Sequence, residues 1–178
     1  IAAAAVANLP ALSLERTLFQ SIKIEDLVVG QFCSDVANVY LRNKWGAVPV
    51  DCEKLEWKLI GWSVEKRPLM ALEFGEKTAP KVTLVQCGIH GDELPSLAMC
   101  MNLIAEVTKE SRKVPSQVRL IVNPLLNPDG MFLSRPTRHN IRGVDINRNF
   151  PTQDWEKSAH FVWKNKEKQD MRKFPGEK

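Results

Sequence analysis

Residues 82–93 read VTLVQCGIHGDE, an apolar run followed by a glycine, a histidine and two carboxylates. Residues 82–85 are of the β-branched and aliphatic kinds that form a buried strand, and Gly88 ends that pattern. We therefore expect a central strand over residues 82–85, with the polar residues just beyond its end. Residues 94–110 repeat apolar side chains at helical spacing, which predicts a helix whose apolar stripe faces the sheet.

His90 and Glu93 are three residues apart in this stretch. If the chain makes one helical turn here, both side chains project to the same side. Neutral imidazole nitrogen and carboxylate oxygen are ligands of Zn²⁺, and a catalytic zinc site combines several protein ligands with a water. An isolated pair at this spacing is weak evidence, because a lone histidine is more often hydrogen-bonded than metal-bound. Gly88 and Gly91 bracket the histidine, free the backbone for a tight turn and favour the metal interpretation.

Three motifs follow one another in order: GIHGDE at 88–93, NPDG at 127–130 and RHNIRGVDINRNFP at 138–151. Together they resemble the zinc metallocarboxypeptidase family, over residues from about 57 to 151. The resemblance implies a carboxypeptidase A-like fold, Zn²⁺ as the cofactor, and His90 and Glu93 as two of its ligands. It also implies a peptide substrate that ends in a free carboxylate.

The third motif supplies the polar groups that the resemblance places around the zinc. Asn147 and Arg148 match the pair that binds the free carboxylate of the substrate, and a planar guanidinium suits that role because it donates two parallel hydrogen bonds. Asp145 matches the carboxylate that receives the second ring N–H of a ligating histidine. The alternative for Arg148 is a surface salt bridge, and for Asp145 a turn or capping role.

Arg138 matches the family arginine that polarises the scissile carbonyl and stabilises the oxyanion. A cation aimed at a developing oxyanion is most effective where water is excluded, and the loss of one such donor costs roughly 3 to 4 kcal/mol. Arg135 and Arg142 are neighbouring alternatives for this role.

The resemblance further implies a third zinc ligand, a histidine on a later strand, and a catalytic glutamate later still. The sequence ends at Lys178 before either. Of the other histidines, His139 lies inside the arginine motif and His160 inside a helix predicted over residues 155–171, and neither has a strand-end setting. We therefore expect a truncated domain that lacks peptidase activity on its own.

Strand patterns over residues 57–64, 68–74 and 118–122 join the strand at 82–85 and the helix at 94–110. They predict an α/β fold with a mixed, mainly parallel sheet flanked by helices. The domain organisation expected is an N-terminal extension over 1–54 and the N-terminal part of a catalytic domain over 55–178. Within the extension, two short helices are predicted around a strand-like segment at 27–29. In the helix at 155–171, Phe161 and Trp163 are expected to be partly buried.

Cys33 and Cys52 can pair in an oxidising compartment, whereas Cys87 and Cys100 are predicted to be unpaired core residues. Residues 1–13, IAAAAVANLPALS, resemble the end of a secretory signal, with an N-terminal arm as the alternative. A periplasmic or secreted location is expected from this segment, and a cytoplasmic one stays open.

The net charge of +4 is spread along the chain, and a basic cluster at 157–173 fits a hydrated helix face better than a site for an anionic polymer. Nucleic acid is therefore not an expected partner. The apolar N-terminal stretch is too short to span a membrane. The oligomeric state is not encoded in any pattern that we identify.

Three functions compete at this level. The first is a zinc peptidase, and its motif forms are similar to those of bacterial murein peptide amidases and cell-wall carboxypeptidases, which implies a muropeptide from peptidoglycan as one possible substrate. The second is an amidohydrolase similar to aspartoacylase and succinylglutamate desuccinylase, which share the zinc pair and the Asn-Arg clamp. The third is a domain that binds peptide without turnover. NPDG and RNFP favour the peptidase.

Overall fold

The structure, a computed structural model, describes residues 24–109, 114–150, 152–155, 157 and 161. Its centre is a four-stranded sheet in the order β1-β2-β4-β3. The strands are β1 (Lys58–Trp62), β2 (Pro68–Phe74), β3 (Lys81–Gln86) and β4 (Val118–Asn123). β2 pairs antiparallel with both β1 and β4, and β3 pairs parallel with β4. The mixed α/β fold predicted from the sequence is confirmed, but the expectation of a mainly parallel sheet is wrong over the described residues, where two of the three strand pairs are antiparallel.

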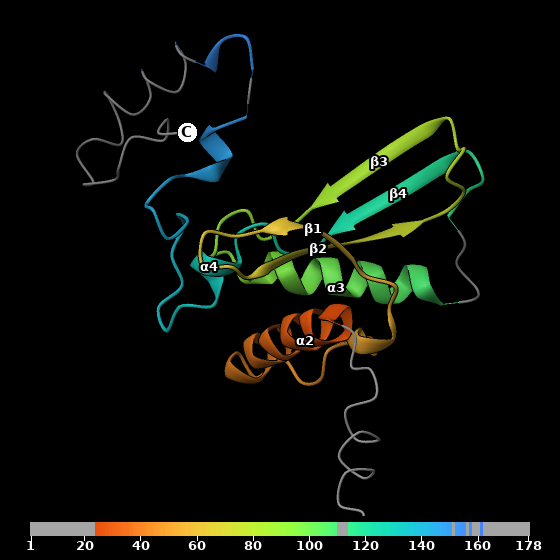
Figure 1. The fold of residues 1–178 in the computed structure, drawn as a ribbon, viewed down its shortest axis with the longest axis horizontal. Coiled ribbons are helices and arrows are strands. Elements are labelled where there is room, and N and C mark those ends of the chain that lie inside the picture. The colour runs from red at the N-terminus through yellow and green to blue at the C-terminus, as the bar shows by residue number, and fades with distance from the viewer. Residues whose placement is uncertain (1–23, 110–113, 151, 156, 158–160, 162–178) are drawn as a thin grey trace, which may run out of the picture.

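Helices α2 (Ile24–Arg42) and α3 (Pro95–Thr108) lie on the same side of this sheet (Figure 1). The apolar stripe of α3 packs into one core with the inward side chains of β2 and β4 and with α2. The fully buried side chains of that core include Phe32, Val36, Val39, Met70, Leu97, Met101, Ile104 and Val122. The N-terminal helix is thus part of the same core as the sheet.

The prediction of two short helices around a strand-like segment at 27–29 is wrong where the chain is described. Residues 24–42 form one continuous helix, and the β-branched pair Val28 and Val29 packs partly buried against the core. Phe32 and Val36 continue the same apolar face at a spacing of four residues. Local β-propensity is therefore overridden by an amphipathic helical pattern.

β3 was expected to be buried at the centre of the sheet, and this is wrong for the part of the chain that the structure describes. There β3 pairs only with β4, so it forms one edge of the sheet. Its Val82 and Leu84 are 60% and 56% exposed, because α2 and α3 cover the opposite face. Apolar composition identifies the strand, but it does not specify which neighbours cover it.

A short carboxylate network fixes the turn between β1 and β2. The buried carboxylate of Asp129 accepts hydrogen bonds from the Ser63 hydroxyl (2.7 Å) and the Glu65 backbone N–H (3.1 Å), and it lies 3.3 Å from Arg67 Nε. Asp129 belongs to the NPDG motif, most of which lies in α4 (Pro128–Met131). The motif therefore anchors the first hairpin to the segment that follows β4.

On the uncovered face of the sheet, Glu73 bridges two cations, Lys58 Nζ at 2.7 Å and Arg119 Nη2 at 2.9 Å. The hydrogen bond from Lys58, followed by the one from Arg119, outweighs burial and lowers the pKa of Glu73 from its ordinary value of 4.5. Because the folded-state pKa is lower, this carboxylate stabilises the fold above the unfolded-state pKa. That contribution is lost as pH falls through the folded-state value.

We therefore expect Glu73→Gln to lower the free energy of unfolding at pH 7 but to differ less from wild type near pH 3. Urea unfolding of both proteins at the two pH values measures the difference. Glu76→Gln, at an exposed position two residues past the strand, is the control and should track wild type throughout. A Glu73→Gln deficit that persists undiminished at pH 3 would contradict the assignment.

Several predictions lie at the edge of the described chain or outside it. Residues 1–13, His160, Trp163 and most of the helix predicted at 155–171 lie outside the described residues. Phe161 is described and is 64% exposed, so the expectation that it is partly buried is wrong. Within the described residues, no helix is long and apolar enough to cross a membrane.

Candidate metal and carboxylate-binding site

The loop that carries His90 begins where β3 and β4 end side by side. Beyond the strands, the pairing continues through hydrogen bonds from Cys87 N–H to the Asn123 carbonyl and from Asn127 N–H to the Gly88 carbonyl, both 2.9 Å. Gly88 has φ +60°, and a Cβ there would lie 2.7 Å from a methyl of Leu125. A side chain here would be strained and would displace Leu125, so glycine is favoured at the point where the chain turns out of the strand.

His90 and Glu93 meet through a single turn, as the sequence predicts. The Glu93 N–H donates to the His90 carbonyl at 3.3 Å, and the ring Nδ1 of His90 lies 2.8 Å from Glu93 Oε1. The His90 side chain is buried, whereas the Glu93 side chain is 55% exposed. The pair therefore faces solvent on the glutamate side only.

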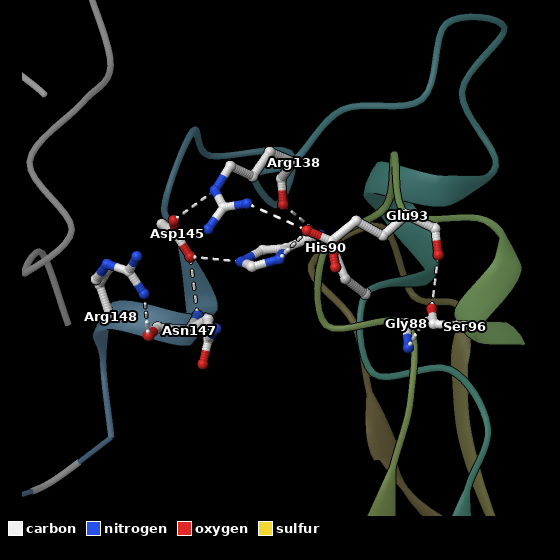
Figure 2. Close-up of polar contacts among 9 residues, drawn as sticks. Gly88, His90, Glu93, Ser96, Arg138, Asp145, Asn147 and Arg148 are labelled. Atoms are coloured by element: carbon white, nitrogen blue, oxygen red, sulfur yellow. Dashed lines mark hydrogen bonds and ion pairs between the residues drawn. The ribbon is translucent and has the colours of Figure 1, made fainter. Parts of the chain in front are cut away.

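The hydroxyl of Ser96 supports this turn, and the sequence analysis did not identify it. Ser96 Oγ donates to the Glu93 carbonyl at 2.6 Å and accepts from the Gly88 N–H at 3.1 Å (Figure 2). The hydroxyl thus joins both ends of the loop that carries His90. A serine in the first turn of a helix was the available signal, since such side chains bond to nearby backbone groups.

Asp145 lies behind the ring of His90 and accepts three hydrogen bonds. They come from His90 Nε2 (3.1 Å), Arg138 Nε (2.9 Å) and the Asn147 N–H (3.0 Å). Burial of Asp145 opposes its ionisation, but the hydrogen bond and charge of Arg138, then those of His90, outweigh burial. The pKa of Asp145 is therefore lower than its ordinary value of 3.8. The structure thus brings Asp145 to the ring nitrogen that the sequence analysis assigned to it.

The donor set of His90 and Glu93 fits a metal ion. Each ring nitrogen of His90 faces a carboxylate oxygen, Nε2 that of Asp145 at 3.1 Å and Nδ1 that of Glu93 at 2.8 Å. In the tautomer that donates from Nε2 to Asp145, Nδ1 presents a lone pair toward Glu93 Oε1. Two lone pairs at 2.8 Å require a shared cation, either a proton or a metal. Imidazole nitrogen and carboxylate oxygen are the donors that zinc accepts.

Arg138 contacts both carboxylates of the site. Its Nη1 lies 3.3 Å from Glu93 Oε1, and its Nε donates to Asp145 at 2.9 Å, so the guanidinium spans the His90 ring (Figure 2). The rival candidates Arg135 and Arg142 are exposed. Of the three candidate arginines, Arg138 is therefore the one that the structure places in contact with His90's two carboxylate partners.

Asn147 and Arg148 follow Asp145 in η2 (Ile146–Arg148). Arg148 Nη1 donates to the Asn147 carbonyl at 3.0 Å, and the Trp155 indole donates to the Arg148 carbonyl at 2.6 Å. In Figure 2, Arg148 lies on the other side of Asp145 from His90. The predicted clamp therefore directly follows Asp145, which caps this short helix and contacts the His90 ring.

Among the residues that the structure describes, no group of three or more His, Cys, Asp and Glu side chains is arranged to hold a metal ion. His139 is described and belongs to no such group. His90 and Glu93 are thus a pair of candidate ligands without a described third.

Both cysteine pairs form disulfides. Cys33 and Cys52 join α2 to η1 (Cys52–Lys54), with Cα atoms 5.7 Å apart. Cys87 and Cys100 are also bonded, with Cα atoms 6.3 Å apart, so the prediction that they are unpaired core residues is wrong. The apolar setting of Cys100 is confirmed, but its face of α3 turns toward the end of β3, where Cys87 lies.

A glycine contact behind the loop yields a testable prediction. A Cβ at Gly91 would lie 2.2 Å from the Gly130 carbonyl carbon and 2.4 Å from the Met131 backbone nitrogen. Because both atoms belong to backbone, Gly91→Ala is expected to lower the free energy of unfolding by about 1–3 kcal/mol or more. Urea unfolding measures this change. The matched control is Gly30→Ala in α2, where nothing lies within 4 Å of the added methyl.

In the control, alanine in a helix should raise stability by roughly 0.5–1 kcal/mol. Equal stability of Gly91→Ala and wild type would show that the loop and the NPDG segment do not pack as closely as described.

The chain was then compared with known proteins. A family model described as zinc carboxypeptidase matches residues 51–175. Mast cell carboxypeptidase A of Mus musculus is 31% identical over 120 residues, which are 57% of this chain and 28% of that protein. Carboxypeptidase E of Caenorhabditis elegans is 30% identical over 138 residues, which are 64% of this chain and 29% of that protein.

A solved structure of bovine thrombin-activatable fibrinolysis inhibitor, in complex with tick carboxypeptidase inhibitor, is similar with a TM-score of 0.51 at 26% identity. The likeness covers 71% of this chain and 44% of that one. The chain spans less than a third of the length of the curated relatives that it matches.

Proposed function

Because the chain belongs to the zinc carboxypeptidase family, we propose that it forms the part of a metallopeptidase that holds zinc and receives the C-terminal carboxylate of a peptide. The observation that carries the proposal is the position of the His90 ring, which is held by Asp145 on one nitrogen and presents the other to Glu93. A ligating histidine needs this arrangement, since its second nitrogen must be fixed by an acceptor.

In this proposal His90 Nδ1 and Glu93 Oε1 are the two zinc ligands of the chain. When bound, zinc supplies Lewis-acid polarisation of the scissile carbonyl and lowers the pKa of a water molecule. No third ligand is arranged with this pair among the described residues, and the chain spans about 28% of a curated relative, so the complete reaction, with its general base, is assigned to a longer polypeptide.

The protein groups around the zinc pair divide the remaining tasks. Asp145 keeps the proton on Nε2 of His90 and fixes the plane of the ring. Arg138, which spans Asp145 and Glu93, brings a positive charge to the edge of the site, where it can turn toward a developing oxyanion. Asn147 and Arg148 receive the free carboxylate, so cleavage removes the terminal residue of the substrate.

The carboxylate clamp of Asn147 and Arg148 can be tested by mutation. Arg148→Lys keeps the positive charge but loses the planar fork, so KM for a peptide with a free carboxylate should rise roughly 10- to 100-fold. KM for the matching C-terminal amide should change little. Steady-state kinetics of the active protein that contains this chain measure both, and Arg142→Lys at an exposed position of the same segment is the control.

A similar KM change on acid and amide substrates would assign Arg148 to structure instead of recognition. Assays of a murein tripeptide, N-acetylaspartate and N-succinylglutamate beside ordinary peptides locate the substrate class. Preference for the two acyl amino acids would favour the amidohydrolase, and carboxylate binding without any turnover would favour the binding domain.

We further infer that the protein works in an oxidising compartment, periplasmic or extracellular. The support is the presence of two disulfides, Cys33–Cys52 and Cys87–Cys100, since such bonds persist mainly outside the reducing cytosol. Thiol quantification of the protein isolated from its native source tests this: free thiols at all four cysteines would contradict it.

A further inference from the structure

The Cys87–Cys100 disulfide encloses the loop that carries both candidate ligands. Cys87 directly follows β3, and Cys100 lies in the second turn of α3, at a sequence separation of 13 residues. His90 and Glu93 fall between them. The bond therefore joins the two elements from which the loop departs and to which it returns.

The ends of this bond differ in their surroundings. Cys100 is 1% exposed and packs in the core between Leu97 and Ile104, so α3 holds it firmly. Cys87 is only partly buried and follows the edge strand of the described sheet, where its backbone bonds to Asn123 at the end of β4 and to Leu126 just after it. The disulfide thus ties the weakly supported end of the loop to its most rigid neighbour.

Noncovalent contacts also hold the loop. Between the loop and α3, the Ser96 hydroxyl bonds to the Gly88 N–H and the Glu93 carbonyl, and the Ser96 N–H donates to the same carbonyl. The first turn of α3 has no side-chain cap at Leu94. The spacing of β3 and α3 is therefore set in part by the disulfide, and with it the position of the whole loop on the sheet.

We propose that the Cys87–Cys100 disulfide is a positioning element of the site, which holds the 88–94 loop in the geometry that lets His90 and Glu93 bind one metal ion. The metal part rests on the proposed function, whereas the ordering of the loop does not. Reduction by a dithiol, itself oxidised to a disulfide, breaks the S–S bond and leaves two protonated thiols. Metal affinity is thereby coupled to the thiol redox state.

The second disulfide provides a matched control. Cys33–Cys52 encloses a similar separation of 19 residues but joins α2 to η1 and carries no site residue. Loop-closure entropy depends only weakly on length, so the two disulfides should contribute similarly to global stability. A difference between their double variants in local order or metal binding is then not a stability effect.

The experiment compares Cys87→Ala/Cys100→Ala, Cys33→Ala/Cys52→Ala and wild type, each in the complete protein that contains this chain. Amide hydrogen exchange followed by mass spectrometry reports on peptides that cover residues 88–94, and titration with zinc alone reports affinity. We expect the Cys87→Ala/Cys100→Ala variant to exchange amide hydrogens faster in that loop. It should also bind zinc roughly 10- to 100-fold more weakly, which is the usual loss of metal affinity when a group that orients a ligand is removed. The Cys33→Ala/Cys52→Ala variant should match wild type in both.

The proposal is overturned if loop exchange in Cys87→Ala/Cys100→Ala equals that of the control variant. If the loop exchanges faster but no protein binds zinc, the positioning role stands and the proposed metal function fails. If the double variant does not fold, the test uses Ser96→Ala, which removes only the hydroxyl that bonds the loop to α3. The Cys87–Cys100 disulfide of the folded Ser96→Ala protein is opened by limited reduction, and amide exchange at residues 88–94 is measured before and after. Faster exchange after reduction supports the proposal, and unchanged exchange overturns it.

Discussion

His90→Ala is expected to abolish zinc retention by the complete protein that contains this chain. The ring provides Nδ1 at 2.8 Å from Glu93 Oε1, and alanine leaves the glutamate as the only described ligand at that position. Loss of a group that merely supports a ligand weakens metal binding by roughly 10- to 100-fold, so loss of the ligand itself should exceed that. Metal analysis after dialysis against a weak chelator measures the result.

Two further variants sharpen this test. Glu93→Gln keeps the size of the second ligand but removes its charge, and it should lose zinc as well. Asp92→Asn changes an exposed carboxylate in the same loop and should retain it. Stoichiometric zinc in His90→Ala would show that the metal is held elsewhere.

Arg138→Ala is expected to lower kcat by about 100- to 1,000-fold while KM changes much less, because an oxyanion contact is made mainly in the transition state. The effect should be equal for free-acid and amidated peptides, which distinguishes it from that of Arg148→Lys. Steady-state kinetics of the active protein on both substrates measure it.

The two ion pairs of Arg138 give this variant a structural component. Removing the guanidinium leaves the buried Asp145 with His90 and the Asn147 N–H as partners, so some loss of stability accompanies the loss of rate. Urea unfolding of the same variant separates the two effects. A KM increase confined to free-acid substrates would move Arg138 to the carboxylate clamp.

Local patterns in the sequence predict much of this architecture. The second strand matches its predicted bounds, and β4 extends its prediction by one residue, because apolar runs end at Gly75 and before Pro124. The turn that joins His90 to Glu93 follows from the glycines around it. The mixed sheet combines a hairpin of β1 and β2 with a strand–helix–strand unit of β3, α3 and β4.

Features that depend on long-range neighbours escape sequence reasoning. The edge position of β3 depends on which strands and helices lie beside it, and an apolar run does not encode that. The Cys87–Cys100 bond requires the register of α3 on the sheet, which is a tertiary property. The ion pair between Arg138 and Glu93 joins residues 45 positions apart and has no local signature.

The parallel pairing of β3 with β4 has a consequence for the order of folding. Val85 is opposite Val122 and Gln86 opposite Asn123, and this ladder leads directly into the bonds at Cys87 and Gly88. A slip of one residue would turn alternate side chains to the wrong face and shift the 88–94 loop along the sheet. Parallel strands pair slowly because they close a long connection. The 88–94 loop, with His90 and Glu93, can therefore reach its place on the sheet only after β3 has paired with β4 in register.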